Sequence, residues 1–178
     1  MIRYLLLAWL LTLSAFSAQA EDFGASGRYV LGSGDKIHIQ VFGEDDLTLE
    51  VRIGDSGKIN YPFLGALKVT GMTESELEHH IMSGLKGDYL IDPQVRISVT
   101  EYRPFYINGE VKKPGGYPFQ PGLTFRKAVS LGGGFTERAS DDEVFVIRES
   151  SGRKEPIAMA LDSSVYPGDI ITVEQSFF

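Results

Sequence analysis

Alternation of apolar and polar residues is the feature that most restricts how this chain can fold. Apolar side chains occupy every second position in residues 36–41, 47–53 and 95–99. Successive side chains of a β-strand point to opposite faces, so this period predicts strands that bury one face. Further strands are predicted at 58–63, 105–111, 117–119, 144–147, 156–159 and 170–173. Short half-buried strands are therefore expected to supply most of the framework.

Gly, Asp and Pro residues mark the places where these strands reverse. Gly54-Asp55-Ser56-Gly57 predicts a turn, after which 58–63 is expected to return as a strand, because Gly and Asp tolerate the backbone angles of a reversal. Residues 112–116 and 150–152 predict two further turns. In the first of these, Pro presets one backbone angle and Gly supplies the next, which favours a hairpin.

One helix is strongly indicated after residue 72. Thr73 stands three residues before Glu76, which is the spacing of a capping box. The apolar residues that follow repeat every four positions and share one helix face; they are Leu77, Ile81 and Leu85. Gly87 is well placed to end this helix.

A second, shorter helix is predicted to begin after Thr124 and to end at Gly132-Gly133-Gly134. We place a domain boundary around residues 102–104, because the strand pattern restarts there. The predicted fold class is α+β, with two small mixed domains over residues 29–102 and 103–176, each laying one helix on a small sheet.

The N-terminus has the order of a secretory signal peptide. A short start carrying Arg3 precedes an uncharged, mostly apolar run at 5–13, and small residues then end in Ala18-Gln19-Ala20. This order predicts a signal peptide over residues 1–20, cleavage between Ala20 and Glu21, and a loose lead-in over 21–28. We therefore expect the mature protein to work outside the cytoplasm.

The sequence contains no Cys and has a formal net charge of −7. The missing Cys excludes disulfides and Cys-type metal sites. It also predicts a protein that is not lipidated, since bacterial lipoproteins need a Cys directly after the cleavage site. The acidic charge argues against nucleic acid, or an anionic membrane surface, as a partner.

Signatures of catalysis are weak, and we predict that the protein is not an enzyme and has no catalytic, cofactor-binding or metal-binding residues. His79 and His80 are adjacent on the predicted helix, so they point about 100° apart and cannot grip one metal together. The pairs Asp45-Asp46 and Asp141-Asp142 are expected to be solvated loop residues. Lys112 and Lys113 are expected in an exposed turn, with contact to an acidic neighbouring subunit as the alternative.

Several short motifs, taken in order, resemble a known family. Residues 29–37 (YVLGSGDKI), 51–59 and 92–99, with the helix from Thr73 between the last two, resemble the polysaccharide export domain of bacterial Wza-type proteins. Residues 107–117 (INGEVKKPGGY) resemble the start of an SLBB domain, a β-grasp-like unit. The resemblance covers about residues 28–174 and implies an N-terminal polysaccharide export domain followed by a C-terminal SLBB domain.

The positions that carry this resemblance are expected to have structural roles, since Gly-Asp before a strand makes a tight turn in which Asp accepts backbone N–H bonds. They are Gly32, Gly34, Asp35, Gly57, Gly109, Val111, Pro114, Gly115, Gly132, Gly133, Pro167, Gly168 and Asp169.

The resemblance also implies a function. Members of the family assemble as periplasmic rings that pass capsular polysaccharide or exopolysaccharide toward the outer membrane, and the ring itself makes or breaks no bond. The implied partners are further copies of the chain, an outer-membrane barrel or pore protein, an inner-membrane polysaccharide co-polymerase and the polysaccharide.

Two differences from the long members shape the expectation. The chain lacks the lipidated Cys, and it stops at Phe178, where long members continue into another SLBB domain and an amphipathic helix. We therefore expect a periplasmic ring-forming conduit or adaptor that is held at the outer membrane through protein contacts. The alternative is a monomeric periplasmic protein that binds a glycan or another small ligand.

Overall fold

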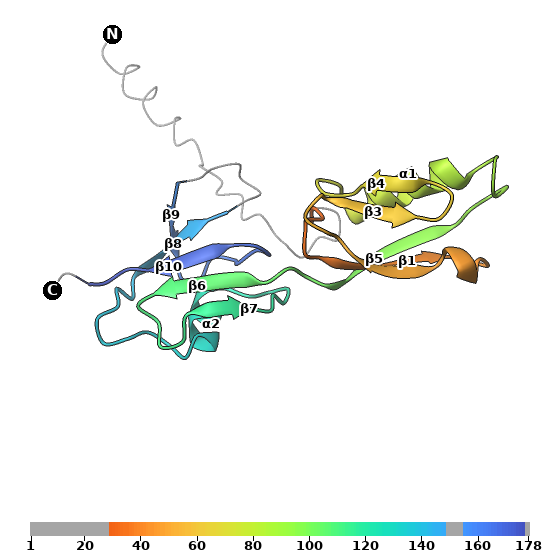
Figure 1. Cartoon of the computed structure of the whole chain (residues 1–178). Coiled ribbons are helices and arrows are strands. Elements are labelled where there is room, and N and C mark those ends of the chain that lie inside the picture. Colours follow the sequence, from red (N-terminus) through yellow and green to blue (C-terminus); the bar gives the residue numbers. More distant parts are fainter. Residues whose placement is uncertain (1–28, 149–154, 177–178) are drawn as a thin grey trace, which may run out of the picture.

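The computed structural model describes residues 29–148 and 155–176. The predicted signal peptide, its cleavage position at Ala20 and Glu21, the lead-in 21–28 and the predicted turn at 150–152 lie outside these residues. The described residues form two α+β units side by side, as Figure 1 shows. Each unit has its own buried apolar cluster.

The first unit is built on an antiparallel sheet of three strands in the order β2-β1-β5. These strands are β1 (Lys36–Val41), β2 (Leu49–Arg52) and β5 (Val95–Glu101). Ile37, Ile39 and Val41 of β1 are buried and alternate with more exposed residues. The period-2 pattern therefore predicted both the central strand and its buried face.

The segment after the Gly54–Gly57 turn corrects one prediction. Strand β3 (Lys58–Tyr61) does not return against β2, because it pairs with β4 (Gly65–Lys68) in a separate hairpin. The predicted strand over 47–53 is also shorter, since Leu47 ends a short 3-10 helix, η1 (Asp45–Leu47). The β3–β4 hairpin packs on the first core through its buried residues Ile59, Tyr61 and Leu67.

Helix α1 (Glu74–Leu85) forms where the sequence predicts it. The Thr73 hydroxyl accepts a hydrogen bond from the Glu76 backbone N–H, and the Glu76 carboxylate accepts one from the Thr73 N–H, so the capping box is confirmed. The predicted apolar face is buried in the first core, namely Leu77, Ile81 and Leu85. His79 and His80 are exposed, as expected.

Glutamates of α1 also cover the outer edge of β5. Glu78 accepts a hydrogen bond from the Ile97 backbone N–H, and Glu74 accepts one from the Val99 N–H, both at 2.9 Å. An uncovered edge strand offers a row of unpaired donors to other chains. The helix therefore both fills the core and satisfies two donors that no neighbouring strand reaches.

The second unit is a five-stranded sheet in the order β7-β6-β10-β8-β9, with helix α2 (Phe125–Leu131). The strands are β6 (Phe105–Gly109), β7 (Gly115–Tyr117), β8 (Glu143–Ile147), β9 (Ile157–Ala160) and β10 (Ile170–Val173). The first and last strands of this unit in the sequence, β6 and β10, lie side by side and run parallel, and β10 is the central strand. This is the arrangement of a β-grasp-like domain.

Most of the strands and the helix predicted for the second unit are confirmed, but the bounds of two strands differ. The predicted strand 105–111 ends at Gly109, because the positive φ of that glycine (82°) turns the chain out of the sheet. The predicted strand 117–119 lies earlier, at 115–117, where it forms the expected hairpin with β6. Helix α2 begins after Thr124 and is followed by Gly133 and Gly134 at positive φ, as the helix-stop prediction requires.

The two units are joined by nearly continuous strand. In Figure 1, β5 leads directly into β6, so one path of backbone runs through both sheets. Tyr102 lies at the junction, with its ring edge-on to Tyr29 of the first unit (5.1 Å) and to Phe119 of the second (5.3 Å). This row of three rings links the two apolar clusters.

Candidate functional site

Asp35 is fully buried immediately before β1, and its carboxylate accepts four hydrogen bonds. Oδ2 accepts from the Tyr29 hydroxyl (2.6 Å), the Gly32 N–H (2.8 Å) and Arg103 Nη1 (3.0 Å). Oδ1 accepts from the Arg103 backbone N–H (2.8 Å). A buried charge needs such partners, so Arg103 in the junction completes the polar core of the first domain.

Tyr29 serves this cluster in its protonated form. Burial, and then the nearby Asp35 carboxylate, raise the pKa of the Tyr29 hydroxyl well above its usual range. The phenol therefore stays protonated at neutral pH and can donate its hydrogen bond to Asp35.

A matching cluster surrounds Asp169 in the second domain. Asp169 is fully buried directly before β10. Its carboxylate accepts hydrogen bonds from Nε and Nη2 of Arg148 and from the Tyr166 backbone N–H, each at 2.9 Å. The Arg148 guanidinium lies over the Tyr166 ring at 4.0 Å. Paired donors of this kind match the geometry of a carboxylate.

The two clusters repeat one local design. Each Asp follows a glycine at positive φ, 95° at Gly34 and 84° at Gly168, and each directly precedes the central strand of its sheet. Each Asp accepts the N–H of the residue three positions earlier and pairs with an Arg that lies near a Tyr ring. The predicted Gly-Asp motifs are thus anchors of the fold in both domains.

Most of the other predicted motif glycines lie where a side chain would not fit or where φ is positive, whereas Gly132 has a φ of −70°. A Cβ at Gly32 would lie 2.3 Å from Arg103, and one at Gly109 would lie 2.1 Å from the Val173 carbonyl oxygen. Gly57 has a φ of 69° and faces Thr70. Gly115 has a φ of 157° in the hairpin, with open space beside it. These placements agree with structural roles.

The structure brings the lysine pair and the glycine run together. The backbone N–H groups of Lys112 and Lys113 donate to the carbonyl oxygens of Gly134 and Gly132. Both lysine side chains are exposed, as is Pro114, whereas Val111, Gly132 and Pro167 are buried. The lysines therefore stand on a loop that is fixed to the end of α2.

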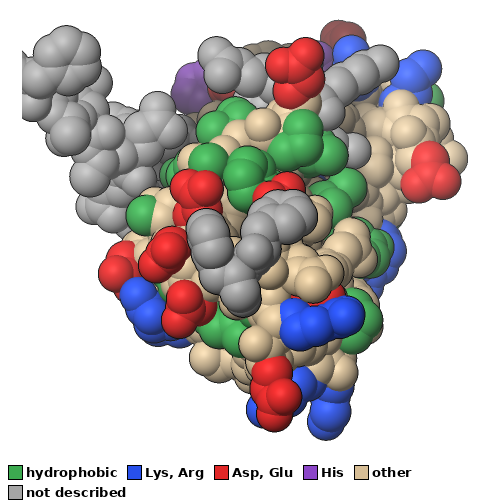
Figure 2. All heavy atoms as spheres, turned by 90° about the vertical axis from the view of Figure 1, so that its left-hand side faces the viewer, with side chains coloured by type: hydrophobic (Ala, Val, Ile, Leu, Met, Phe, Trp, Pro, Cys, Tyr) green, Lys and Arg blue, Asp and Glu red, His purple; other side chains and the backbone are tan. Residues whose placement is uncertain are grey.

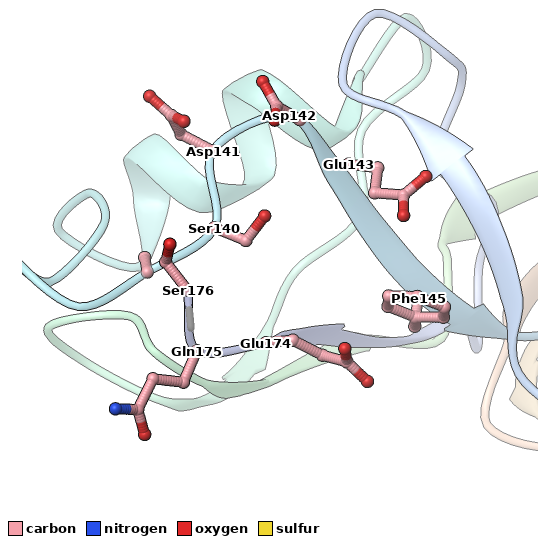
Figure 3. Close-up of a pocket in the computed structure, with 9 residues that line it drawn as sticks. Ser140, Asp141, Asp142, Glu143, Phe145, Glu174, Gln175 and Ser176 are labelled. Atoms are coloured by element: carbon pink, nitrogen blue, oxygen red, sulfur yellow. The ribbon is translucent and has the colours of Figure 1, made fainter. Parts of the chain in front are cut away.

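The free end of the second domain carries an open acidic pocket of about 230 Å³. Figure 3 shows its lining on the start of β8 and the segment after β10, with Asp141, Asp142, Glu143 and Glu174 around it. Figure 2, which faces this end of the molecule, shows acidic side chains spread over the surface. Asp141 and Asp142 are exposed, as predicted for solvated loop carboxylates.

The opposite end of the molecule exposes several large hydrophobic side chains among charged ones. Figure 1 shows three connections there, which are the β1–β2 loop, the β3–β4 turn and the α1–β5 loop. These connections hold four exposed large hydrophobic residues: Phe42, Phe63, Tyr89 and Ile91. We refer to these four residues as the apolar tip. Nothing in the local sequence patterns around these four residues marks them as exposed.

Residues 29–148 and 155–176 contain no group of three or more His, Cys, Asp or Glu side chains able to hold a metal ion. Neither helix in those ranges is long and apolar enough to cross a bilayer.

Comparison with known proteins then gives the family. The family described as polysaccharide biosynthesis/export protein matches residues 24–100, and the SLBB domain family matches residues 104–158. The chain belongs to the polysaccharide biosynthesis/export family. Its two domains are the polysaccharide export domain and the SLBB domain, in the order that the motifs implied.

Several named relatives match most of this chain. The chain is 35% identical to the exopolysaccharide production protein ExoF of Rhizobium meliloti, over 75% of this chain and 34% of that protein. It is 30% identical to the EPS I polysaccharide export outer membrane protein EpsA of Ralstonia nicotianae, over 69% of this chain and 35% of that protein. The polysialic acid transport protein KpsD of Escherichia coli is 28% identical, over 75% of this chain and 25% of that protein. The matched region thus spans about a quarter to a third of these relatives.

Proposed function

We propose that this protein is a periplasmic component of a machine that exports capsular polysaccharide or exopolysaccharide. The observation that carries the proposal is the presence of a polysaccharide export domain followed by an SLBB domain in one chain. Arg103 and the Tyr29–Tyr102–Phe119 ring row make contacts at the junction between them. In this proposal the protein makes and breaks no bonds. It receives polymer from an inner-membrane polysaccharide co-polymerase and passes it toward an outer-membrane barrel or pore protein.

We further propose that copies of the chain form a closed ring. A ring needs two different surfaces on each subunit that fit one another with a closing rotation. Exposed Lys112 and Lys113 stand on a fixed loop, and the protein offers acidic surface at the end of the SLBB domain. Charge complementarity between such surfaces would set the partner and the register of the contact.

Native mass spectrometry of the secreted protein tests the ring. A discrete assembly of several copies is expected, and the double variant Lys112→Glu/Lys113→Glu is expected to dissociate it. The matched control is Lys58→Glu/Lys68→Glu, which makes the same change in charge. These two residues face each other as a cross-strand pair in the β3–β4 hairpin, away from the Lys112–Lys113 loop. A strict monomer at high concentration that binds glycan would favour the monomeric binding protein instead.

Deletion of the gene tests export itself. Polymer retained inside the envelope, and secretion restored by the wild-type chain, are the expected results. Unchanged secretion after deletion would contradict the role in export.

A further inference from the structure

The apolar tip contains a stacked pair of exposed aromatic rings. The rings of Phe63 and Tyr89 are 4.7 Å apart and nearly parallel, at 25°. Phe63 is 63% exposed and Tyr89 is 47% exposed. Exposed apolar groups that gather in one place on a soluble surface usually mark a binding site.

The backbone at Phe63 is held in a conformation that costs free energy. Phe63 has a φ of 63°, and it is the one non-glycine residue with positive φ among residues 29–148 and 155–176. Glycine would adopt this conformation without strain. Strain of this kind persists where the surroundings enforce it and is concentrated at functional sites.

Neighbouring contacts hold the chain segments that carry both rings. Leu64, next to Phe63, lies so close to α1 that a Cβ on Gly84 would be 2.9 Å from its methyl groups. The backbone N–H groups of Tyr89 and Leu90 both donate to the Leu85 carbonyl oxygen at the end of the helix. The pair is therefore a preformed platform, and binding to it would need little further ordering.

The charges around the platform narrow the class of ligand. The same connections carry the exposed carboxylates Glu44, Asp45, Asp46, Asp88 and Asp92, with Lys86 as the basic residue among them. Anionic lipid and nucleic acid would be repelled by this end of the domain. Aromatic faces with hydrogen-bond acceptors around them suit an uncharged pyranose ring, whose C–H face packs on the aromatic ring while its hydroxyls donate to carboxylates.

The area available also favours a sugar over a second protein. A stable protein interface buries about 800 Å² on each partner, and four partly exposed side chains on three loops supply a fraction of that. A pyranose ring, in contrast, needs one or two aromatic faces. We propose that the Phe63–Tyr89 pair binds uncharged pyranose residues of a polysaccharide, an inference that rests on the proposed role in export.

Affinity electrophoresis tests the proposal, with deproteinised exopolysaccharide from the producing cells cast into a native gel. We expect the polymer to retard the wild-type protein, and Phe63→Gly and Tyr89→Ala to weaken its binding about tenfold each. Phe63→Gly removes the ring while relieving the backbone, so the fold is retained, which circular dichroism would check. Tyr89→Phe keeps the stacking and should bind as wild type does.

The matched control is Leu131→Ala, which removes an exposed apolar side chain at the end of α2. It should leave retardation unchanged. The proposal is overturned if the wild-type protein is not retarded, or if Phe63→Gly and Tyr89→Ala bind the polymer as the wild type does.

Secretion by cells that carry the same variants separates this inference from the proposed function. If the wild-type chain restores secretion to the deletion strain while no polymer binding is found, export stands and the sugar platform fails. If the variants lose secretion without any polymer binding by the wild type, the tip contacts a protein or a second copy, and the sugar platform again fails.

Discussion

Arg103 donates to both oxygens of the Asp35 carboxylate, through its backbone N–H to Oδ1 and through Nη1 to Oδ2. The Asp35 side chain is completely buried, and that of Arg103 is 13% exposed. This pair connects a residue before the first strand with one in the junction between the domains. Its loss should therefore affect the fold more than any surface ion pair.

We predict that Arg103→Met lowers the free energy of unfolding by about 3 kcal/mol, because it leaves a buried carboxylate without its cation. Urea denaturation measures this change. The control is Arg126→Met, which removes an exposed pair with Asp162 and should cost less than about 1 kcal/mol. Equal losses in the two variants would contradict the role given to the Asp35 cluster.

Gly109→Ala should disrupt the SLBB domain. The new Cβ would lie 2.1 Å from the Val173 carbonyl oxygen, at a φ of 82°. Left-handed strain and the forced movement of β10 together should cost about 3 kcal/mol or more. Thermal unfolding measures the effect, and Gly54→Ala, which has open space and no positive φ, should leave the midpoint nearly unchanged.

The glutamates of α1 should protect the edge of β5. Glu78→Ala removes the acceptor of the Ile97 N–H, so that amide should exchange with deuterium about tenfold faster. Glu78→Gln keeps an acceptor oxygen and should restore most of the protection. Unchanged exchange at Ile97 in Glu78→Ala, measured by NMR, would show that the carboxylate does not cap the edge.

Acid should destabilise the protein in part through Glu110. The hydrogen bond from Thr136, and then the charge of Arg138, lower the pKa of the Glu110 carboxyl from its ordinary value of 4.5. A carboxyl with a lowered pKa in the folded state stabilises the protein above its unfolded-state pKa, and this contribution is lost as the pH falls through the folded-state pKa.

Thr136→Val should therefore shrink the loss of stability between about pH 5 and pH 3. Urea midpoints at several pH values measure it. The same acid-induced loss in Thr136→Val and in the wild type would mean that the hydrogen bond does not set the pKa of Glu110.

The strands and helices were largely predictable because their signals are local. The alternation in 36–41 and the Thr73–Glu76 capping box each specify an element within a few residues. The partner of β3 was not predictable in this way, because alternation says which face is buried and not which strand lies beside it. Strand β4 has a single buried residue, Leu67, and so carries almost no pattern.

The buried Asp–Arg clusters were likewise predictable only in part. The Gly-Asp motifs at 34–35 and 168–169 are visible in the sequence, since both precede an apolar strand. Their arginines are not, because Arg103 and Arg148 lie 68 and 21 positions away from their aspartates. The Phe63–Tyr89 pair likewise arises from two loops that only the fold brings together.

The position of Arg103 makes the first domain depend on a residue outside its own family match. The two family matches end at residue 100 and begin again at residue 104, so the cation that neutralises Asp35 belongs to neither. A fragment cut at the first of these limits would keep the donors Tyr29 and Gly32 but would bury the Asp35 carboxylate without its cation, and it should be unstable. The first domain therefore cannot complete its polar centre without Arg103, a residue at the very start of the second domain.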